Sequence, residues 1–236
     1  MSGSLVTPEL RARIRGLMTP IAVGLGRLGL SPNALTVIGF LIAIVAAAAA
    51  ALQLWLPAGL LVIFGGVFDL FDGALARATG RVSKLGAFLD STFDRWGEGV
   101  VYTGIVMGCL GSGFALGAVL ATIALSSAFM VSYTRAKSEG LGYVPGKGMA
   151  NVGLAPREVR LVILTVGLVL AGLQGTANPM LILKGIALPG GIVVNAPWEG
   201  EIWLLWSLLL IAVLATITTI QRIVATVRQA GKASSD

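Results

Sequence analysis

The sequence predicts an all-α integral membrane protein, in which six transmembrane helices follow an amphipathic helix lying at the membrane interface. Of the 236 residues, 56% are hydrophobic and only 12% are charged, whereas soluble domains carry about 25% charged residues. Long apolar stretches recur between turn residues, and about 20 such residues are enough to span a bilayer. Basic residues gather at alternate ends of these stretches, which is typical of a multi-pass protein.

The first 30 residues are expected to form a cytoplasmic segment with a juxtamembrane helix. Arginines are scattered through this segment and it lacks a compact apolar core, so a cleavable signal peptide is not expected. Apolar residues recur three or four apart from Leu10 to Leu28, while Arg11 and Arg15 lie off that stripe. The spacing predicts a helix, and an apolar span directly after it favours a place at the membrane interface over the surface of a soluble domain.

Residues 31–228 are expected to form one six-helix transmembrane domain. The segment 174–200 is rich in Gly, Pro and Asn around an apolar middle, which fits either an outer loop or a partial hairpin. A disordered tail is expected at 229–236. The predicted spans are residues 34–56, 58–78, 85–110, 114–135, 157–173 and 201–227.

The charge distribution orients these spans. With the N-terminus in the cytoplasm, the loops 79–84 and 136–156 and the C-terminus lie there too, and nearly every Lys and Arg falls on that side, with Lys184 as the clear exception. The sequence therefore predicts a multi-pass protein of the cytoplasmic cell membrane. The net charge of +6 is explained by contact with anionic membrane lipids, so nucleic acid is not expected as a partner.

The absence of histidine narrows the available chemistry. Proton transfer near neutral pH then falls mainly to carboxylates. The single cysteine, Cys109, lies in an apolar run and is expected to be inert. A bound metal ion would be held by oxygen, which favours hard ions such as magnesium or manganese.

Four aspartates stand where a membrane span should be apolar. A charged side chain at the centre of a bilayer costs at least about 2.5–3.5 kcal/mol on insertion scales, so Asp69, Asp72, Asp90 and Asp94 need a reason to be there. Asp69 and Asp72 are three residues apart and Asp90 and Asp94 are four apart, so each pair shares a helix face. A short cytoplasmic loop joins the two helices, which are therefore expected to be antiparallel neighbours. The four carboxylates would then meet at one depth, where one or two divalent cations would relieve their repulsion.

Small and basic residues border this acidic cluster. Gly73 follows Asp72, and Gly86 faces it from the next helix, so side-chain bulk is missing where a ligand can approach. Arg77 and Arg81 lie just above the carboxylates, where they can hold phosphate.

The two acidic spans resemble the signature of the CDP-alcohol phosphotransferase family at every fixed position, and the six-span layout with its amphipathic first helix is also similar. The resemblance implies displacement of CMP from a CDP-linked lipid by an alcohol, which would make 31–228 a catalytic domain. The matching residues are Asp69, Asp72, Gly73, Ala76, Arg77, Gly86, Asp90 and Asp94.

The resemblance also implies roles for individual residues. Asp69, Asp72 and Asp90 would hold Mg²⁺ or Mn²⁺, as two ions, and position the diphosphate, while Asp94 would act as general base and also contact metal. Two such ions can stabilise both the attacking and the leaving oxygen. A homodimer is the expectation for the family. The CDP-lipid pocket would be lined by Asn33, Thr36, Asp69, Asp72, Gly73, Ala76 and Arg77. Arg81 is added to this set because it lies just above the carboxylates.

The acceptor alcohol is indicated by a second group of charges. Five basic residues fall at predicted cytoplasmic helix ends, where together they can form an anion pocket for an acceptor that already carries a phosphate. They are Arg135, Lys137, Arg157, Arg160 and Arg222.

The segments 133–139, 157–161 and 221–222 resemble those of prokaryotic phosphatidylinositol-phosphate synthases, which join CDP-diacylglycerol to inositol 1-phosphate. Arg135 stands where lysine is more usual, but the positive charge is kept. The archaeal counterpart, with an ether lipid as donor, is equally compatible. Phosphatidylglycerol-phosphate synthase, with glycerol 3-phosphate as acceptor, is the alternative within the same chemistry. An ion or metal transporter is a distant alternative, because transporters often carry internal repeats and this sequence shows none.

Overall fold

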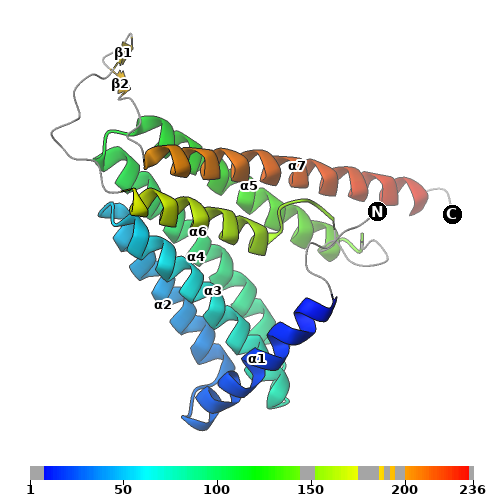
Figure 1. Ribbon diagram of the computed structural model, residues 1–236. Coiled ribbons are helices and arrows are strands. Elements are labelled where there is room, and N and C mark those ends of the chain that lie inside the picture. The colour runs from blue at the N-terminus through cyan, green and yellow to red at the C-terminus, as the bar shows by residue number, and fades with distance from the viewer. Residues whose placement is uncertain (1–7, 144–151, 175–185, 189–191, 195–199, 234–236) are drawn as a thin grey trace.

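The protein is described from a computed structural model. The structure describes residues 8–143, 152–174, 186–188, 192–194 and 200–233. Within these ranges it consists of seven helices and one short antiparallel strand pair (Figure 1). The elements are α1 (Pro8–Arg27), α2 (Pro32–Ala51), α3 (Trp55–Ala78), α4 (Lys84–Gly111), α5 (Ala115–Gly140), α6 (Arg157–Leu173), β1 (Ile186–Leu188), β2 (Ile192–Val194) and α7 (Glu201–Ala233).

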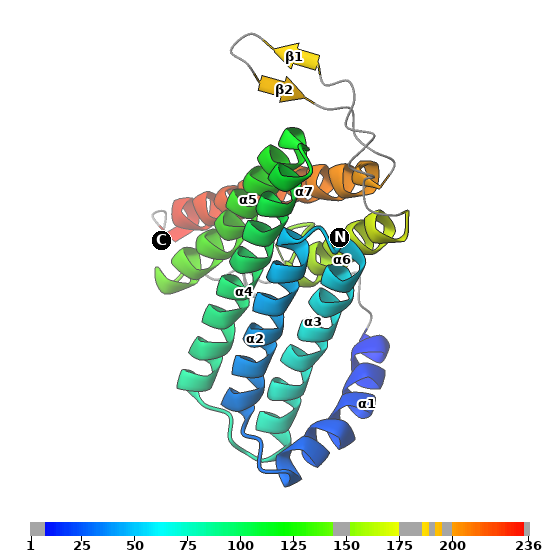
Figure 2. The same cartoon turned by 90° about the vertical axis from the view of Figure 1, so that its left-hand side faces the viewer.

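The helices form two groups that meet at one end (Figures 1 and 2). Helices α2, α3 and α4 run side by side, and α2 packs along both α3 and α4. Helices α5, α6 and α7 form the second group and cross the first at a steep angle. The groups join where α6 packs on α3 and α5 packs on α4, while α1 lies against α3.

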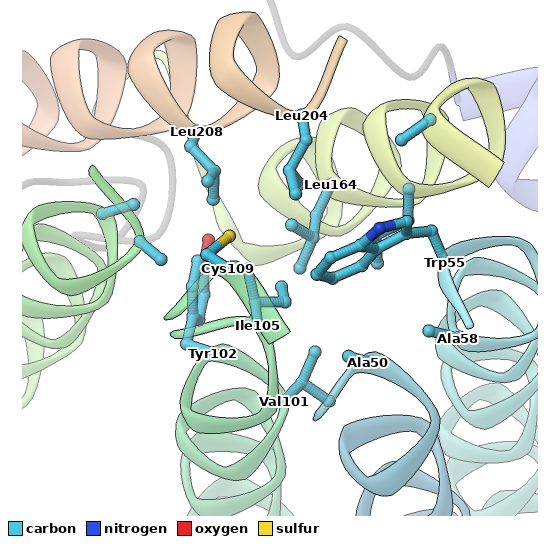
Figure 3. Packing of buried hydrophobic residues seen from close by; sticks show 14 of the residues in the cluster. Ala50, Trp55, Ala58, Val101, Tyr102, Ile105, Cys109, Leu164, Leu204 and Leu208 are labelled. Atoms are coloured by element: carbon cyan, nitrogen blue, oxygen red, sulfur yellow. The ribbon is translucent and has the colours of Figure 1, made fainter. Parts of the chain in front are cut away.

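The main core fills the junction between the two groups (Figure 3). Trp55 from α3, Tyr102 and Ile105 from α4 and Leu208 from α7 are almost completely buried there. Small residues bring α2 and α4 together, because a Cβ atom added at Gly104 would run into the backbone of Ala47. Close approach through glycine is the usual way in which helices pack inside a membrane.

Capping residues fix the starts of the two helices that border the acidic cluster. The Ser31 hydroxyl accepts a hydrogen bond from the Ala34 amide at 3.1 Å at the start of α2. At the start of α4, the Ser83 hydroxyl accepts from the Gly86 amide at 3.0 Å. Serine is among the preferred N-cap residues because its oxygen satisfies an otherwise unpaired helix amide.

Four of the described helices are long and apolar enough to cross a membrane: α2, α3, α5 and α7. Helix α6 has only 17 residues, and α4 carries charged side chains along its first half. The helical, membrane-embedded architecture is thus as predicted at this coarser level, and the count of six spans stays a prediction.

The strands β1 and β2 pair antiparallel within 174–200, which agrees with the partial hairpin, one of the two alternatives left open for this segment. The structure differs from the prediction in two local features. Helix α7 continues to Ala233 and takes in most of the tail predicted to be disordered at 229–236. Helix α5 extends to Gly140, five residues beyond its predicted end. Residues 144–151 of the predicted loop 136–156 lie outside the described residues.

Candidate active site

The four predicted aspartates come from α3 and α4 and lie around α2. Asp69 and Asp72 are on the last part of α3, and Asp90 and Asp94 are on the first part of α4. Figure 2 shows α2 between these helices, so the two acidic helices are arranged around α2 rather than as the simple neighbouring pair that was expected. The carboxylates are still close enough to interact electrostatically. Asp69 and Asp90 repel each other, and both repel Asp72 and Asp94.

Helix α2 supplies two residues that shape this cluster. The Thr36 hydroxyl donates a hydrogen bond to Asp72 Oδ2 at 2.6 Å, and both side chains are buried. Gly39 faces Asp69, and a Cβ atom added there would lie 2.9 Å from Asp69 Oδ1. Thr36 was predicted to line the site. Gly39 was not, because nothing in the sequence marks one glycine of an apolar span as the one that faces a carboxylate.

Arg157 joins α6 to both acidic helices. Its Nη2 atom lies 2.7 Å from Asp69 Oδ2 and 2.9 Å from Asp94 Oδ1. Its Nε atom is buried and has no hydrogen-bond partner among the described residues. The sequence placed Arg157 in a separate acceptor pocket, whereas the structure places it directly on the aspartates.

A cavity borders these charges. Asp69, Asp94 and Arg157 line one part of it, and Glu98 and Arg160 also border it. Most of the remaining lining is apolar and comes from α2, α3, α4 and α6. A ligand with a charged head and an apolar body matches such a lining, because each part would meet surface of its own kind.

The aspartate cluster fits a divalent cation by charge and by donor type. The donors are carboxylate oxygens that repel one another, which hard ions such as Mg²⁺ prefer. As the side chains stand, no three acidic, histidine or cysteine residues in the described part of the chain are grouped closely enough to hold one ion. The Arg157 guanidinium instead supplies the positive charge between Asp69 and Asp94.

The other residues predicted for the CDP-lipid pocket lie near the same helix ends. Asn33 Oδ1 is 3.6 Å from the position that a Cβ atom on Gly86 would take, so the starts of α2 and α4 adjoin. Arg77 is exposed, and its Nη1 would lie 3.2 Å from a Cβ atom on Gly73. Arg81 lines a second groove between α1 and α3, away from the aspartates. Ala76 lies half-buried on α3 beside Arg77.

The five residues predicted to hold an acceptor phosphate occupy different surroundings. Arg135 and Lys137 are exposed on the last turns of α5, and Arg135 pairs with Glu139 at 3.1 Å. Arg222 is only 3% exposed and donates to the backbone carbonyls of Val131 and Val152. Arg160 is 1% exposed and is engaged by a carboxylate from α4. Arg222 nevertheless lies within electrostatic range of Arg135 and Arg160, with Glu139 also in range.

Glu98 is the partner of Arg160 and was not identified from the sequence. Its two carboxylate oxygens accept hydrogen bonds from Arg160 at 3.0 and 2.9 Å. A signal was present, since Glu98 follows Asp94 by four residues, as Asp94 follows Asp90, and so extends one acidic helix face.

Apolar helices long enough to cross a bilayer, together with a carboxylate cluster beside an amphipathic cavity, define a membrane protein with a charged site for a lipid-like ligand. A family model, CDP-alcohol phosphatidyltransferase, matches residues 29–227. The chain therefore belongs to the CDP-alcohol phosphatidyltransferase family. This membership favours the enzyme hypothesis over the transporter alternative.

Similar proteins come from both archaea and bacteria. An archaetidylinositol phosphate synthase of Pyrococcus horikoshii is 38% identical over 66% of this chain and 78% of its own length. A phosphatidylinositol phosphate synthase of Streptomyces avermitilis is 36% identical over 98% of this chain and 86% of its own length. The phosphatidylinositol phosphate synthase of Mycobacterium tuberculosis, solved with CDP-DAG bound, has a TM-score of 0.70 at 28% identity and covers 89% of this chain and 92% of its own. A second structure of that enzyme, in complex with manganese and citrate, has a TM-score of 0.69 at 28% identity and covers 89% of this chain and 88% of its own.

Proposed function

We propose that this protein transfers a phosphatidyl group from CDP-diacylglycerol, or from its ether-lipid analogue, to inositol 1-phosphate and releases CMP. Family membership supports the CDP-lipid donor, and the names of the relatives support an inositol phosphate acceptor. The observation that carries the proposal is the meeting of Asp69, Asp94 and Arg157 at one cavity. Acidic groups that could hold a cation and act as a base would then lie beside a basic group that could bind a phosphate.

In this reaction the acceptor hydroxyl attacks the phosphorus that bears the lipid. A new P–O bond forms, the bond to the CMP oxygen breaks, and the hydroxyl proton goes to Asp94 Oδ1 or Oδ2. Asp69, Asp72 and Asp90 would hold Mg²⁺ or Mn²⁺, as two ions. Such ions, when bound, neutralise the diphosphate and stabilise the attacking and leaving oxygens. The Thr36 hydroxyl would keep Asp72 in one orientation.

The acceptor phosphate would be bound by Arg157 together with the basic residues of α5 and α7. Arg157 already lies against Asp94, so a phosphate on its guanidinium would bring the acceptor hydroxyl near the proposed base. Arg135, Lys137 and Arg222 would add charge at the same end of the molecule. The CDP-lipid would meet Asn33, Gly73, Ala76 and Arg77, with Arg81 as the outermost contact.

An acceptor panel tests this function. Purified protein in detergent would be given CDP-diacylglycerol and Mg²⁺ with inositol 1-phosphate, inositol, glycerol 3-phosphate or serine, and CMP release would be measured. We expect release with inositol 1-phosphate, complete loss on chelation by EDTA, and recovery with Mg²⁺ or Mn²⁺. Faster release with glycerol 3-phosphate would favour phosphatidylglycerol-phosphate synthase instead. CMP release without a divalent ion would contradict the proposal. A failure of all four acceptors to cause CMP release would also contradict it.

We further propose six membrane spans, with both termini and the site at the cytoplasmic face of the cell membrane, and a homodimer as the assembly. Cys109 is the single cysteine of the sequence and is buried. A C109A background removes this thiol, so that single cysteines can be introduced at exposed positions for labelling from outside intact cells. A cysteine in place of Lys137 should remain unlabelled until the cells are opened. Labelling of Lys137→Cys in intact cells would contradict this orientation, and a monomer by light scattering in detergent would contradict the dimer.

A further inference from the structure

A buried ion pair next to the proposed active site has no role in the chemistry described above. Arg160 lies on the first turn of α6, three residues after Arg157, and is 1% exposed. Its Nε and Nη2 atoms donate to the two oxygens of Glu98 at 3.0 and 2.9 Å, and its Nη1 donates to the Ala155 carbonyl at 3.0 Å. All three guanidinium nitrogens of Arg160 are therefore engaged by the protein itself.

The chain just before α6 is held on its other side by α7. The amides of Leu154 and Ala155 both donate to the Thr218 hydroxyl, at 3.0 and 2.9 Å. Pro156, at the N-cap position of α6, makes no side-chain capping bond. The start of α6 is thus fixed to α4 through Glu98 and to α7 through Thr218 rather than by a cap of its own.

This fixation determines where Arg157 can reach. Arg157 is the first residue of α6, and a long arginine side chain loses much conformational freedom when it is held in one place. With the backbone of this turn anchored, the guanidinium needs only to settle between Asp69 and Asp94. A misplacement of about 1 Å in a positioning group can cost about a hundredfold. For a group that binds the acceptor phosphate, this loss is expected in the KM for the acceptor.

A contribution to stability alone is a weak explanation for the pair. Desolvation of two charges offsets most of their attraction, and well-packed apolar residues often serve as well or better. We propose that Glu98 and Arg160 are positioning residues, which fix the first turn of α6 so that Arg157 presents its guanidinium to the aspartates and to the acceptor phosphate. The second half of this statement rests on the proposed function.

The substitution Arg160→Lys tests the proposal because lysine keeps the charge but cannot make the two-point contact with Glu98 and also reach Ala155. We expect the KM for inositol 1-phosphate to rise by about tenfold or more, with the KM for CDP-diacylglycerol within about twofold of the wild type. Arg228→Lys, on an exposed part of α7, is the matched control and should change neither KM. A lower kcat with both KM values unchanged would mean a merely structural role and would overturn the proposal.

A second measurement does not depend on turnover. Mn²⁺ binding would be followed by calorimetry on the wild type and on Arg160→Lys. If the pair holds Arg157 on Asp69 and Asp94, loosening it should weaken that competition and strengthen Mn²⁺ binding. Equal Mn²⁺ affinity of the wild type and Arg160→Lys would contradict the proposal. This result would count even if no alcohol in the acceptor panel had given CMP release. Glu98→Gln, which keeps the shape of the side chain and removes its charge, replaces Arg160→Lys if the latter does not fold, with the same expected changes.

Discussion

The Nη2 atom of Arg157 lies 2.9 Å from Oδ1 of Asp94, which ties the first residue of α6 to the residue proposed as general base. The same nitrogen contacts Asp69, so a single cation serves carboxylates from two helices. Arg157, the proposed phosphate-binding residue, is therefore in direct contact with Asp94, the proposed base. An acceptor held by its phosphate would be delivered to the base without a large movement of the chain.

Asp94→Asn should strongly reduce turnover and leave binding of the CDP-lipid largely intact. The asparagine oxygen can still accept a hydrogen bond from Arg157, but the amide cannot take up the proton of the acceptor hydroxyl. General bases contribute about 10²–10⁴-fold to a rate, so we expect CMP release to fall by that range. Activity within tenfold of the wild type, with unchanged CDP-lipid affinity, would rule out Asp94 as the base.

Thr36→Val should weaken binding of the divalent ion. Valine has nearly the shape of threonine but cannot make the 2.6 Å hydrogen bond to Asp72. Groups that orient a metal-binding carboxylate typically change metal affinity by about 10–100-fold. The measurement is the Mg²⁺ concentration that gives half-maximal CMP release. Thr36→Ser keeps the hydroxyl and is the control, and an equal effect of both substitutions would assign the change to packing.

Arg157→Gln should have opposite effects on the two proposed ligands. Loss of the cation leaves Asp69 and Asp94 without their shared partner, so Mn²⁺ should bind more tightly by calorimetry. The acceptor phosphate loses a charge-assisted contact, so the KM for inositol 1-phosphate should rise by about tenfold or more. A higher acceptor KM without tighter Mn²⁺ binding would mean that Arg157 does not compete with the ion.

The helices and the identity of the acidic residues could be predicted because both depend on local patterns. The turn at Ser31 and Pro32 marks the start of α2, and the predicted second span ends at the same residue, Ala78, as α3. The spacing of Asp90 and Asp94 alone places them on one helix face. Such features need only the residues within one or two helical turns.

The rest of the site depends on contacts between distant segments, which one sequence does not reveal. Glu98 and Arg160 are 62 positions apart, and each could have been a membrane-flanking charge. Arg157 lies 88 positions from Asp69, and nothing local distinguishes it from the exposed Arg135. The position of α2 between α3 and α4 follows from how apolar helices pack, and their apolar residues are too alike to specify a partner.

Gly104→Ala should loosen the contact between α2 and α4 and, with it, the site. A Cβ atom at this position would overlap the backbone of Ala47, which cannot move aside as a side chain can. Overpacking of this kind costs about 1–3 kcal/mol.

Gly99→Ala, on the same helix, is the matched control, because its Cβ atom would lie 3.6 Å from the ring of Phe129, an ordinary contact. Membrane proteins often unfold irreversibly, so the comparison is the half-life of CMP release at a fixed elevated temperature in detergent. The half-life should fall for Gly104→Ala and stay near that of the wild type for Gly99→Ala. Equal half-lives for both variants would show that α2 and α4 can separate without loss of the site, which would remove the reason for glycine at residue 104.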